Sequence, residues 1–260
     1  MQLPNPAPAV GHARGTVHLV KGGEGGEGHA RVERNQGGEG GEGGEGGKPS
    51  QAKDEAAFLT DVAFMEGHLR AGMALYRAGD LAAAKTHMGH PLEEKFAAVE
   101  HPLEERGFGD LEDLIDGLMD AAEDEKPVDQ VAALFDKITA RTRAVHEASP
   151  GGPAAALRSL ALLTRIAAEE YAEGTEGGKV SNLHEYQDAW GFMRAVEAEA
   201  EVYAASGNAS VAEAARAILA QVRTTDPAFG DLQGQGQMEM DAALLYGAAA
   251  RMEIAALAVK

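Results

Sequence analysis

The sequence predicts an all-α protein, a multi-helix bundle of antiparallel helices with a Gly/Glu-rich N-terminal arm. From residue 54 onward Ala and Leu are abundant and runs of β-branched residues are absent, which favours helices over strands. Gly and Pro fall between the segments in which apolar residues have helical spacing. No segment alternates polar and apolar residues as a half-buried strand does.

The first 53 residues have a different composition, in which the triplet GGE recurs with a period of three. A Gly-rich tract of this kind buries too little apolar surface to fold alone. In an extended polyproline-II-like strand this period would place the glutamates along one edge. We therefore expect residues 1–53 to form a low-complexity arm or linker and residues 54–260 to form an all-helical bundle domain.

Helix-start and helix-stop signals divide the bundle domain into elements. Asp80, Asp110 and either Asn208 or Ser210 are natural N-caps, and Pro91 and Pro102 suit the first turn of a helix. The expected helices are near residues 54–78, 80–89, 92–99, 102–106, 110–125, 128–147, 153–173, 183–205, 209–223 and 236–258.

The charge of the chain excludes some partners and favours others. The chain carries 23 Lys and Arg against 42 Asp and Glu, which gives a formal net charge of −19. Such a surface repels nucleic acid and anionic membranes and attracts cations. Because there is no cysteine, thiolate metal sites, iron–sulfur clusters and c-type haem attachment are excluded. No run of 18 apolar residues occurs, so we expect no membrane-spanning segment.

The opening MQLPNPAPAVGHARG lacks the basic and apolar regions of a signal peptide. Its Pro/Ala/Asn-rich composition is typical of a mature exported protein whose signal has been replaced by a start codon, and we expect a periplasmic location. The sequence contains no GxSxG motif, no P-loop and no HExxH motif. We therefore expect a binding protein rather than an enzyme.

A histidine-rich hairpin is the strongest chemical signal in the sequence. Four of the nine histidines of the chain lie between residues 64 and 106: His68, His87, His90 and His101. A turn at residues 79–80 would make the two flanking helices antiparallel neighbours. Reflection of positions about residue 79 places His68 level with His90, and His87 lies three residues from His90 on the same helix face.

These histidines predict a metal site made of His68, His87 and His90, which His101 or a glutamate such as Glu94 would complete. Imidazole and carboxylate together suit a transition-metal ion such as iron, copper or zinc. Each histidine alone also has a structural interpretation as a helix cap or a surface residue. The motif HPLEE, at 90–94 and again at 101–105, predicts two helix starts with carboxylates in the first turn.

A second cluster of candidate ligands lies between residues 161 and 192. One helix ends with Glu170 and Glu173, and after a Gly-rich turn the next helix begins with His184 and Glu185. If these four residues meet, they form an oxygen-rich site that favours a harder ion such as ferric iron or calcium. The alternative is structural, with the carboxylates acting as helix caps.

The same segment resembles the extracytoplasmic helical domain attached to some bacterial high-affinity ferric iron permeases. The residues that carry the resemblance are Glu170–Tyr171, Gly178–Val180 and Asn182–Gln187, in which Glu185–Tyr186 takes the position of the family's EY pair. The acidic iron-transport motifs of the permease itself are absent. The resemblance implies an extracytoplasmic all-α protein that handles iron or another metal, with a membrane permease or another protein as partner.

The sequence therefore predicts a metal-binding protein that acts in metal uptake or handling, with a transition-metal ion as its ligand. A protein of another class remains as an alternative, a helical structural or interaction subunit that docks through its N-terminal arm. A b-type haem protein with His or Met axial ligands is a third interpretation.

Overall fold

The computed structural model describes residues 55–260, which belong to one compact unit spanning residues 46–260. The predicted arm, residues 1–53, lies outside the described residues. The all-α fold is confirmed, because the described part is helical apart from one hairpin of two-residue strands. No helix in this part is both long and apolar enough to span a membrane.

The predicted helical hairpin begins the described chain. Helix α1 (Glu55–Ala78) is followed by α2 (Leu81–His90), and the turn between them contains Gly79, whose φ is +84°. A left-handed conformation of this kind favours glycine. The side chain of Asp80 accepts a hydrogen bond from the backbone N–H of Ala83 and so caps α2. The predicted turn and the antiparallel pairing of the two helices are both observed.

The two predicted helices at 92–99 and 102–106 are wrong in their boundaries. A π-helical turn, η1 (Pro91–Lys95), follows α2 directly and runs into α3 (Phe96–Glu105). Pro102 lies inside α3 rather than at a helix start, where its missing N–H removes one backbone hydrogen bond. The glutamates of the second HPLEE motif consequently lie in the last turn of a helix and not in the first.

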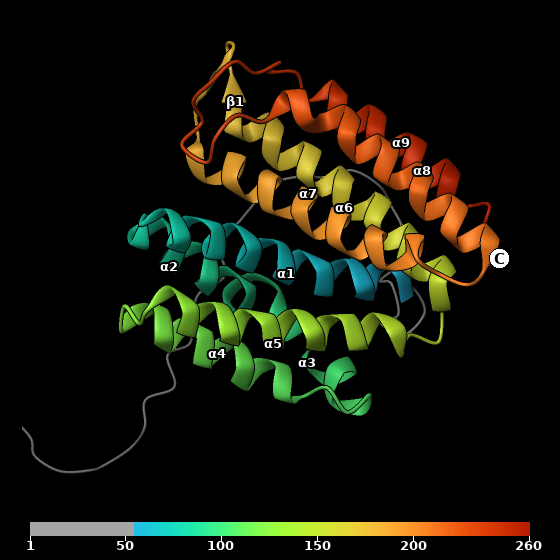
Figure 1. Ribbon diagram of the computed structural model, residues 1–260, viewed down its shortest axis with the longest axis horizontal. Helices are drawn as coiled ribbons and strands as arrows, with labels where there is room; N and C mark the ends of the chain where they lie inside the picture. Colours follow the sequence, from blue (N-terminus) through green and yellow to red (C-terminus); the bar gives the residue numbers. More distant parts are fainter. Residues whose placement is uncertain (1–54) are drawn as a thin grey trace, which may run out of the picture. The chain divides into compact units, whose positions relative to one another are not determined.

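Helices α4 (Asp110–Glu123) and α5 (Val128–Glu147) complete the first group of helices. Helix α5 packs on α1 and α4, and α4 also packs on α2. Figure 1 shows this group, coloured from blue to light green, as one side of the described part.

The second group is a four-helix arrangement of α6 (Gly152–Gly174), α7 (Leu183–Ala204), α8 (Ala209–Thr225) and α9 (Ala243–Ala256). Between α6 and α7 lies an antiparallel hairpin of β1 (Thr175–Glu176) and β2 (Lys179–Val180). Helix α6 packs on α7 and α9, and α8 packs on α7 and α9 (Figure 1).

The last helix begins later than the sequence predicts, at Ala243 instead of residue 236. A short 3₁₀ turn, η2 (Asp226–Ala228), and a loop precede it. The hydroxyl of Tyr171 donates to the carbonyl of Ala228 at 2.6 Å, and the hydroxyl of Tyr186 accepts from the backbone N–H of Gly230 at 2.7 Å. These buried tyrosines hold the segment across the ends of α6 and α7. Its backbone groups therefore form hydrogen bonds with the tyrosine hydroxyls instead of forming another helical turn.

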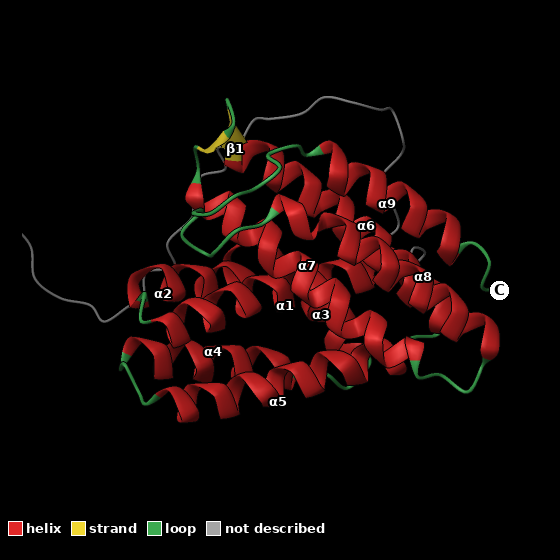
Figure 2. Cartoon of the chain, turned by 45° about the horizontal axis from the view of Figure 1, so that its top comes forward, coloured by secondary structure: helices red, strands yellow, loops and turns green. Residues whose placement is uncertain are grey.

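Helix α1 joins the two groups because it packs on both α6 and α7 (Figure 2). The α1–α7 contact is close at Gly67 and Gly191. A Cβ atom on Gly191 would lie 2.3 Å from the carbonyl oxygen of Gly67, and a Cβ on Gly67 would lie 2.3 Å from the ring of Phe192. Side chains at these two positions would therefore push the helices apart. This close approach sets the distance between His68 on α1 and Asp188 on α7.

Candidate metal centre

Three helices bring four metal-ligating side chains together inside the described part of the chain. His68 comes from α1, His87 and His90 come from α2, and Asp188 comes from α7. One donor atom from each residue lies within 4.8 Å of the donors of the other three. The donors around a tetrahedral zinc ion are about 3.4 Å apart, since each lies about 2.0–2.2 Å from the ion. Small side-chain movements are enough to close such a shell.

The centre of the cluster is buried, and some of its polar atoms lack hydrogen-bond partners among residues 55–260. His68 and Asp188 are each 2% exposed and His87 is fully buried. Nδ1 of His68 lies 2.6 Å from Oδ1 of Asp188, but the geometry is not that of a hydrogen bond. Both ring nitrogens of His68 therefore lack a hydrogen-bond partner among residues 55–260. A buried polar atom without a partner is costly, and a bound cation would supply one.

The tautomer of His87 follows from its hydrogen-bond network. The side-chain amide of Gln187 donates to the carbonyl of Leu232 at 2.7 Å, so its oxygen is left to face Nε2 of His87 at 2.9 Å. Nε2 must then carry a proton and donate it. Nδ1 of His87 lies 2.8 Å from Oδ1 of Asp188 and is the nitrogen that faces the cluster. Metal-binding histidines are commonly oriented in this way by an acceptor on the outer nitrogen.

The electrostatics of the cluster favour a positive charge beside Asp188. Burial alone would raise the pKa of Asp188, but its contacts with His68 and His87 outweigh burial and hold that pKa far below its ordinary value. Burial would lower the pKa of His87, yet the hydrogen bond and charge of Asp188 raise it overall. Burial, together with the neighbouring His68, lowers the pKa of His90. The carboxylate is thus held ionised, and either a proton on His87 or a metal ion can neutralise it.

Two further groups border the four donors. The ring of His184 stacks on that of His87 with 4.4 Å between centroids, and its Nδ1 lies 3.5 Å from Oδ2 of Asp188. Glu94 lies in the π-helical turn, where one of its oxygens is 3.7 Å from Nε2 of His68. Such turns occur often at functional sites. Burial raises the pKa of Glu94 and lowers that of His184.

The second predicted cluster adjoins the first. His184, Glu185 and Asp188 form one group of converging donors, and Glu170, Glu173 and Glu185 form another. The two groups share Glu185, while Asp188 is shared with the histidine cluster. Burial, and then a hydrogen bond with Glu185, raises the pKa of Glu170 to about 8, so this carboxyl group holds a proton at neutral pH. The two predicted clusters therefore adjoin each other through Asp188 and Glu185.

One predicted ligand lies elsewhere, and one residue of the cluster was not predicted. His101 is on α3 with its side chain 78% exposed, and Nε2 lies 3.2 Å from an oxygen of Glu105. The structure does not bring it to the other histidines. Asp188 was not among the predicted ligands, although it lies four residues after His184 on the same helix face. That spacing relates Asp188 to His184, but it does not relate Asp188 to the histidines of α1 and α2.

The fold and this cluster define a helical-bundle protein in which side chains that could bind a metal ion are buried between the helices. Residues 150–242 match the model of the iron permease-associated 4-helix bundle domain. The resemblance predicted from residues 161–192 is thus confirmed, and the match extends over α6, α7, α8 and the whole segment between α8 and α9. No match was found among curated proteins or among solved structures.

The match divides the candidate site into two parts. Asp188 and His184 lie within the matched segment, as do Glu170, Glu173 and Glu185. The three remaining histidines lie before it, in α1 and α2: His68, His87 and His90. The association with iron permeases therefore concerns the carboxylate side of the cluster, whereas the hairpin supplies most of the nitrogen donors.

Proposed function

We propose that the protein binds a transition-metal ion through His68, His87, His90 and Asp188 and acts in iron uptake or handling. The observation that carries the proposal is the convergence of three imidazoles on one buried, ionised carboxylate. The match to an iron permease-associated domain supports iron as the physiological metal.

The donor set suits a divalent ion of intermediate hardness. Three imidazole nitrogens and one carboxylate oxygen are ligands that Fe²⁺, Zn²⁺ and Cu²⁺ all accept, whereas Ca²⁺ and Mg²⁺ prefer oxygen ligands alone. The neighbouring group of Glu170, Glu173 and Glu185 is oxygen-rich and suits a harder ion such as ferric iron. We therefore expect the nitrogen-rich position to bind more tightly to divalent ions and the carboxylate group to be a second, weaker position.

Binding at the histidine cluster is an exchange of a proton for a metal ion. With no metal bound, the raised pKa of His87 favours the protonated ring beside Asp188. The metal requires Nδ1 without its proton, so protons compete with the metal. Because the pKa of His87 is raised, metal affinity should begin to fall at a pH above the ordinary histidine range and should fall further as the pH drops through that range.

We further propose that the protein works in the periplasm beside a membrane permease. The support is the association of the matched domain with iron permeases. In that role the protein would take up an ion and present it to the permease.

Elemental analysis and titration of the purified full chain with Fe²⁺, Zn²⁺ and Cu²⁺ test the metal site. We expect one tightly bound ion per chain, and loss of that ion in the double variant His68→Ala/His87→Ala. The matched control is His101→Ala, which removes an exposed imidazole outside the cluster and should keep the tight ion. Tight binding that survives the double variant, or an absence of binding in the wild-type chain, would refute the proposed site.

A further inference from the structure

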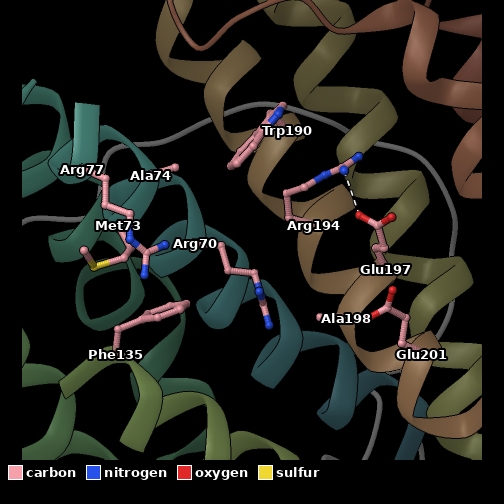
Figure 3. A pocket seen from close by; sticks show the side chains of 10 residues that line it. All are labelled: Arg70, Met73, Ala74, Arg77, Phe135, Trp190, Arg194, Glu197, Ala198 and Glu201. Atoms are coloured by element: carbon pink, nitrogen blue, oxygen red, sulfur yellow. Dashed lines mark hydrogen bonds and ion pairs between the residues drawn. The ribbon is translucent and has the colours of Figure 1, made fainter. Parts of the chain in front are cut away.

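A groove lies between α1, α5 and α7 and is separate from the metal cluster. Its volume is about 450 Å³, within the range of about 300–1,000 Å³ that small-molecule sites occupy. Ten residues line it: Arg70, Met73, Ala74, Arg77, Phe135, Trp190, Arg194, Glu197, Ala198 and Glu201 (Figure 3). Arg70 and Trp190 each follow a cluster residue by two positions, which turns them to nearly the opposite helix face.

Arginine is concentrated in this groove although the chain is acidic. Residues 55–260 carry 17 Lys and Arg against 35 Asp and Glu. Two of the three guanidinium groups are already neutralised. Arg70 pairs with Glu66 at 2.7 Å, and Arg194 pairs with Glu197 at 2.7 Å. Arg77 is exposed and makes no ion pair with any residue from 55 to 260. It is therefore the guanidinium available to a ligand.

The available positive charge lies beside aromatic rings. Figure 3 shows Arg77, Met73 and Phe135 at one end of the groove, with Glu197 and Glu201 at the other. The guanidinium of Arg70 lies 5.8 Å from the centroid of Phe135, and that of Arg194 lies 5.8 Å from the ring of Trp190. These paired guanidinium groups help to hold the two rings in place as walls of the groove.

We propose that the Arg77 end of this groove binds a small aromatic carboxylate. The planar fork of an arginine matches a carboxylate and can form two parallel hydrogen bonds with it. An aromatic ring attached to that carboxylate would pack against Phe135 and Trp190. A small anion without a ring would gain only the contact with Arg77, and Glu201 at the far end disfavours an anion that extends along the whole groove.

The protein contains its own probe for this site, because Trp190 is the only tryptophan in the chain. We would titrate the full chain with benzoate and follow the tryptophan fluorescence, and also the indole N–H signal of Trp190 in ¹H–¹⁵N NMR spectra. We expect a saturable change with benzoate. Acetate and inorganic phosphate should bind at least tenfold more weakly, since neither offers a ring.

Two variants separate a specific site from a general charge effect. Arg77→Ala should weaken benzoate binding about tenfold, as expected for the loss of a charge-assisted pair. Arg223→Ala is the matched control, because it removes an exposed arginine on α8 away from the groove and should leave binding unchanged. The proposal is overturned by the absence of a saturable response, by equal responses to acetate and benzoate, or by an Arg77→Ala chain that is folded by circular dichroism and binds as the wild type does.

Discussion

Two buried carboxyl groups on α7 lie beside histidines, but their pKa values are shifted in opposite directions. Asp188 lies among His68, His87 and His90, and its pKa is held far below the ordinary value. Glu199 lies eleven residues later on nearly the same helix face, where one of its oxygens is 3.4 Å from Nδ1 of His146. Burial raises the pKa of Glu199 to about 8 and lowers that of His146 to about 4. At neutral pH both groups of the second pair are therefore uncharged.

The difference shows what a buried carboxylate needs in order to attract a cation. Asp188 has imidazoles on several sides, and their contacts outweigh the cost of burial. Glu199 faces one imidazole, while the charge of Glu66 adds to burial in favouring its protonated form. Oε1 of Glu199 and Nδ1 of His146 lack hydrogen-bond partners among the described residues. Convergence of several donors, and not burial of a His–carboxylate pair, distinguishes the proposed metal site.

The largest effect should come from Asp188→Asn, which keeps the shape of the side chain and removes its charge. The variant loses the ionised oxygen that neutralises a bound cation, so we expect the affinity for Zn²⁺ to fall at least about 100-fold. Competitive titration against a chelator measures this. The control is Asp136→Asn on the exposed face of α5. Equal losses in both variants would show that net charge, and not the cluster, attracts the metal.

A substitution in the other pair should change stability instead of metal binding. In the unfolded chain Glu199 ionises near its ordinary pKa, whereas in the folded chain it stays protonated up to about pH 8. Folding therefore loses stability as the pH rises between these values, and Glu199→Gln removes that loss. We expect a gain of about 2–4 kcal/mol at pH 9 and little gain at pH 5.

Urea unfolding of the wild-type chain and of Glu199→Gln at both pH values measures this gain. Glu213→Gln, on the exposed face of α8, is the control and should be neutral at both. A gain at pH 5 as large as that at pH 9 would contradict a buried, protonated carboxyl group.

A smaller effect should come from Gln187, which holds the outer nitrogen of His87. Gln187→Leu removes the acceptor that fixes the tautomer, so we expect metal affinity to fall about tenfold. Gln187→Glu keeps an acceptor facing Nε2 of His87 but loses the donor to the carbonyl of Leu232, so we expect it to lose less metal affinity than Gln187→Leu. If both variants lose affinity equally, the role of Gln187 is packing and not orientation of the ring.

The smallest effect should come from Glu94, at the edge of the cluster. Its side chain is 45% exposed, and its nearest contact with His68 is 3.7 Å long. We expect Glu94→Gln to lower metal affinity only about two- to fivefold, because water screens a charge at this position. A loss as large as that of Asp188→Asn would make Glu94 a direct ligand and would change the assigned set.

The part of the site that depends on local geometry could be predicted from the sequence. The turn at Gly79–Asp80 fixes the level of His68 against His90, and helical spacing places His87 beside His90. Asp188 could not be assigned in the same way, because it reaches His87 across 101 positions of sequence. The contact between Asp188 and His87 depends on the close packing of α1 on α7, and a local sequence pattern does not encode that packing.

The two errors in the predicted helices have the same origin. The proline at position 102 was interpreted as a helix start, but α3 continues through it after a π-helical turn. The segment before α9 was assigned to the last helix, yet Tyr171 and Tyr186 hold the chain in a loop. In both places, contacts with distant residues decide the boundary, so local propensity is a poor guide.

The most direct test of the metal centre is an anomalous difference map from crystals of the full chain grown with Zn²⁺. The account predicts a peak about 2.0–2.2 Å from donor atoms of His68, His87, His90 and Asp188. A map whose ordered zinc lies only at Glu170, Glu173 and Glu185, or at the exposed His101, with no peak among the three histidines and Asp188, would contradict it.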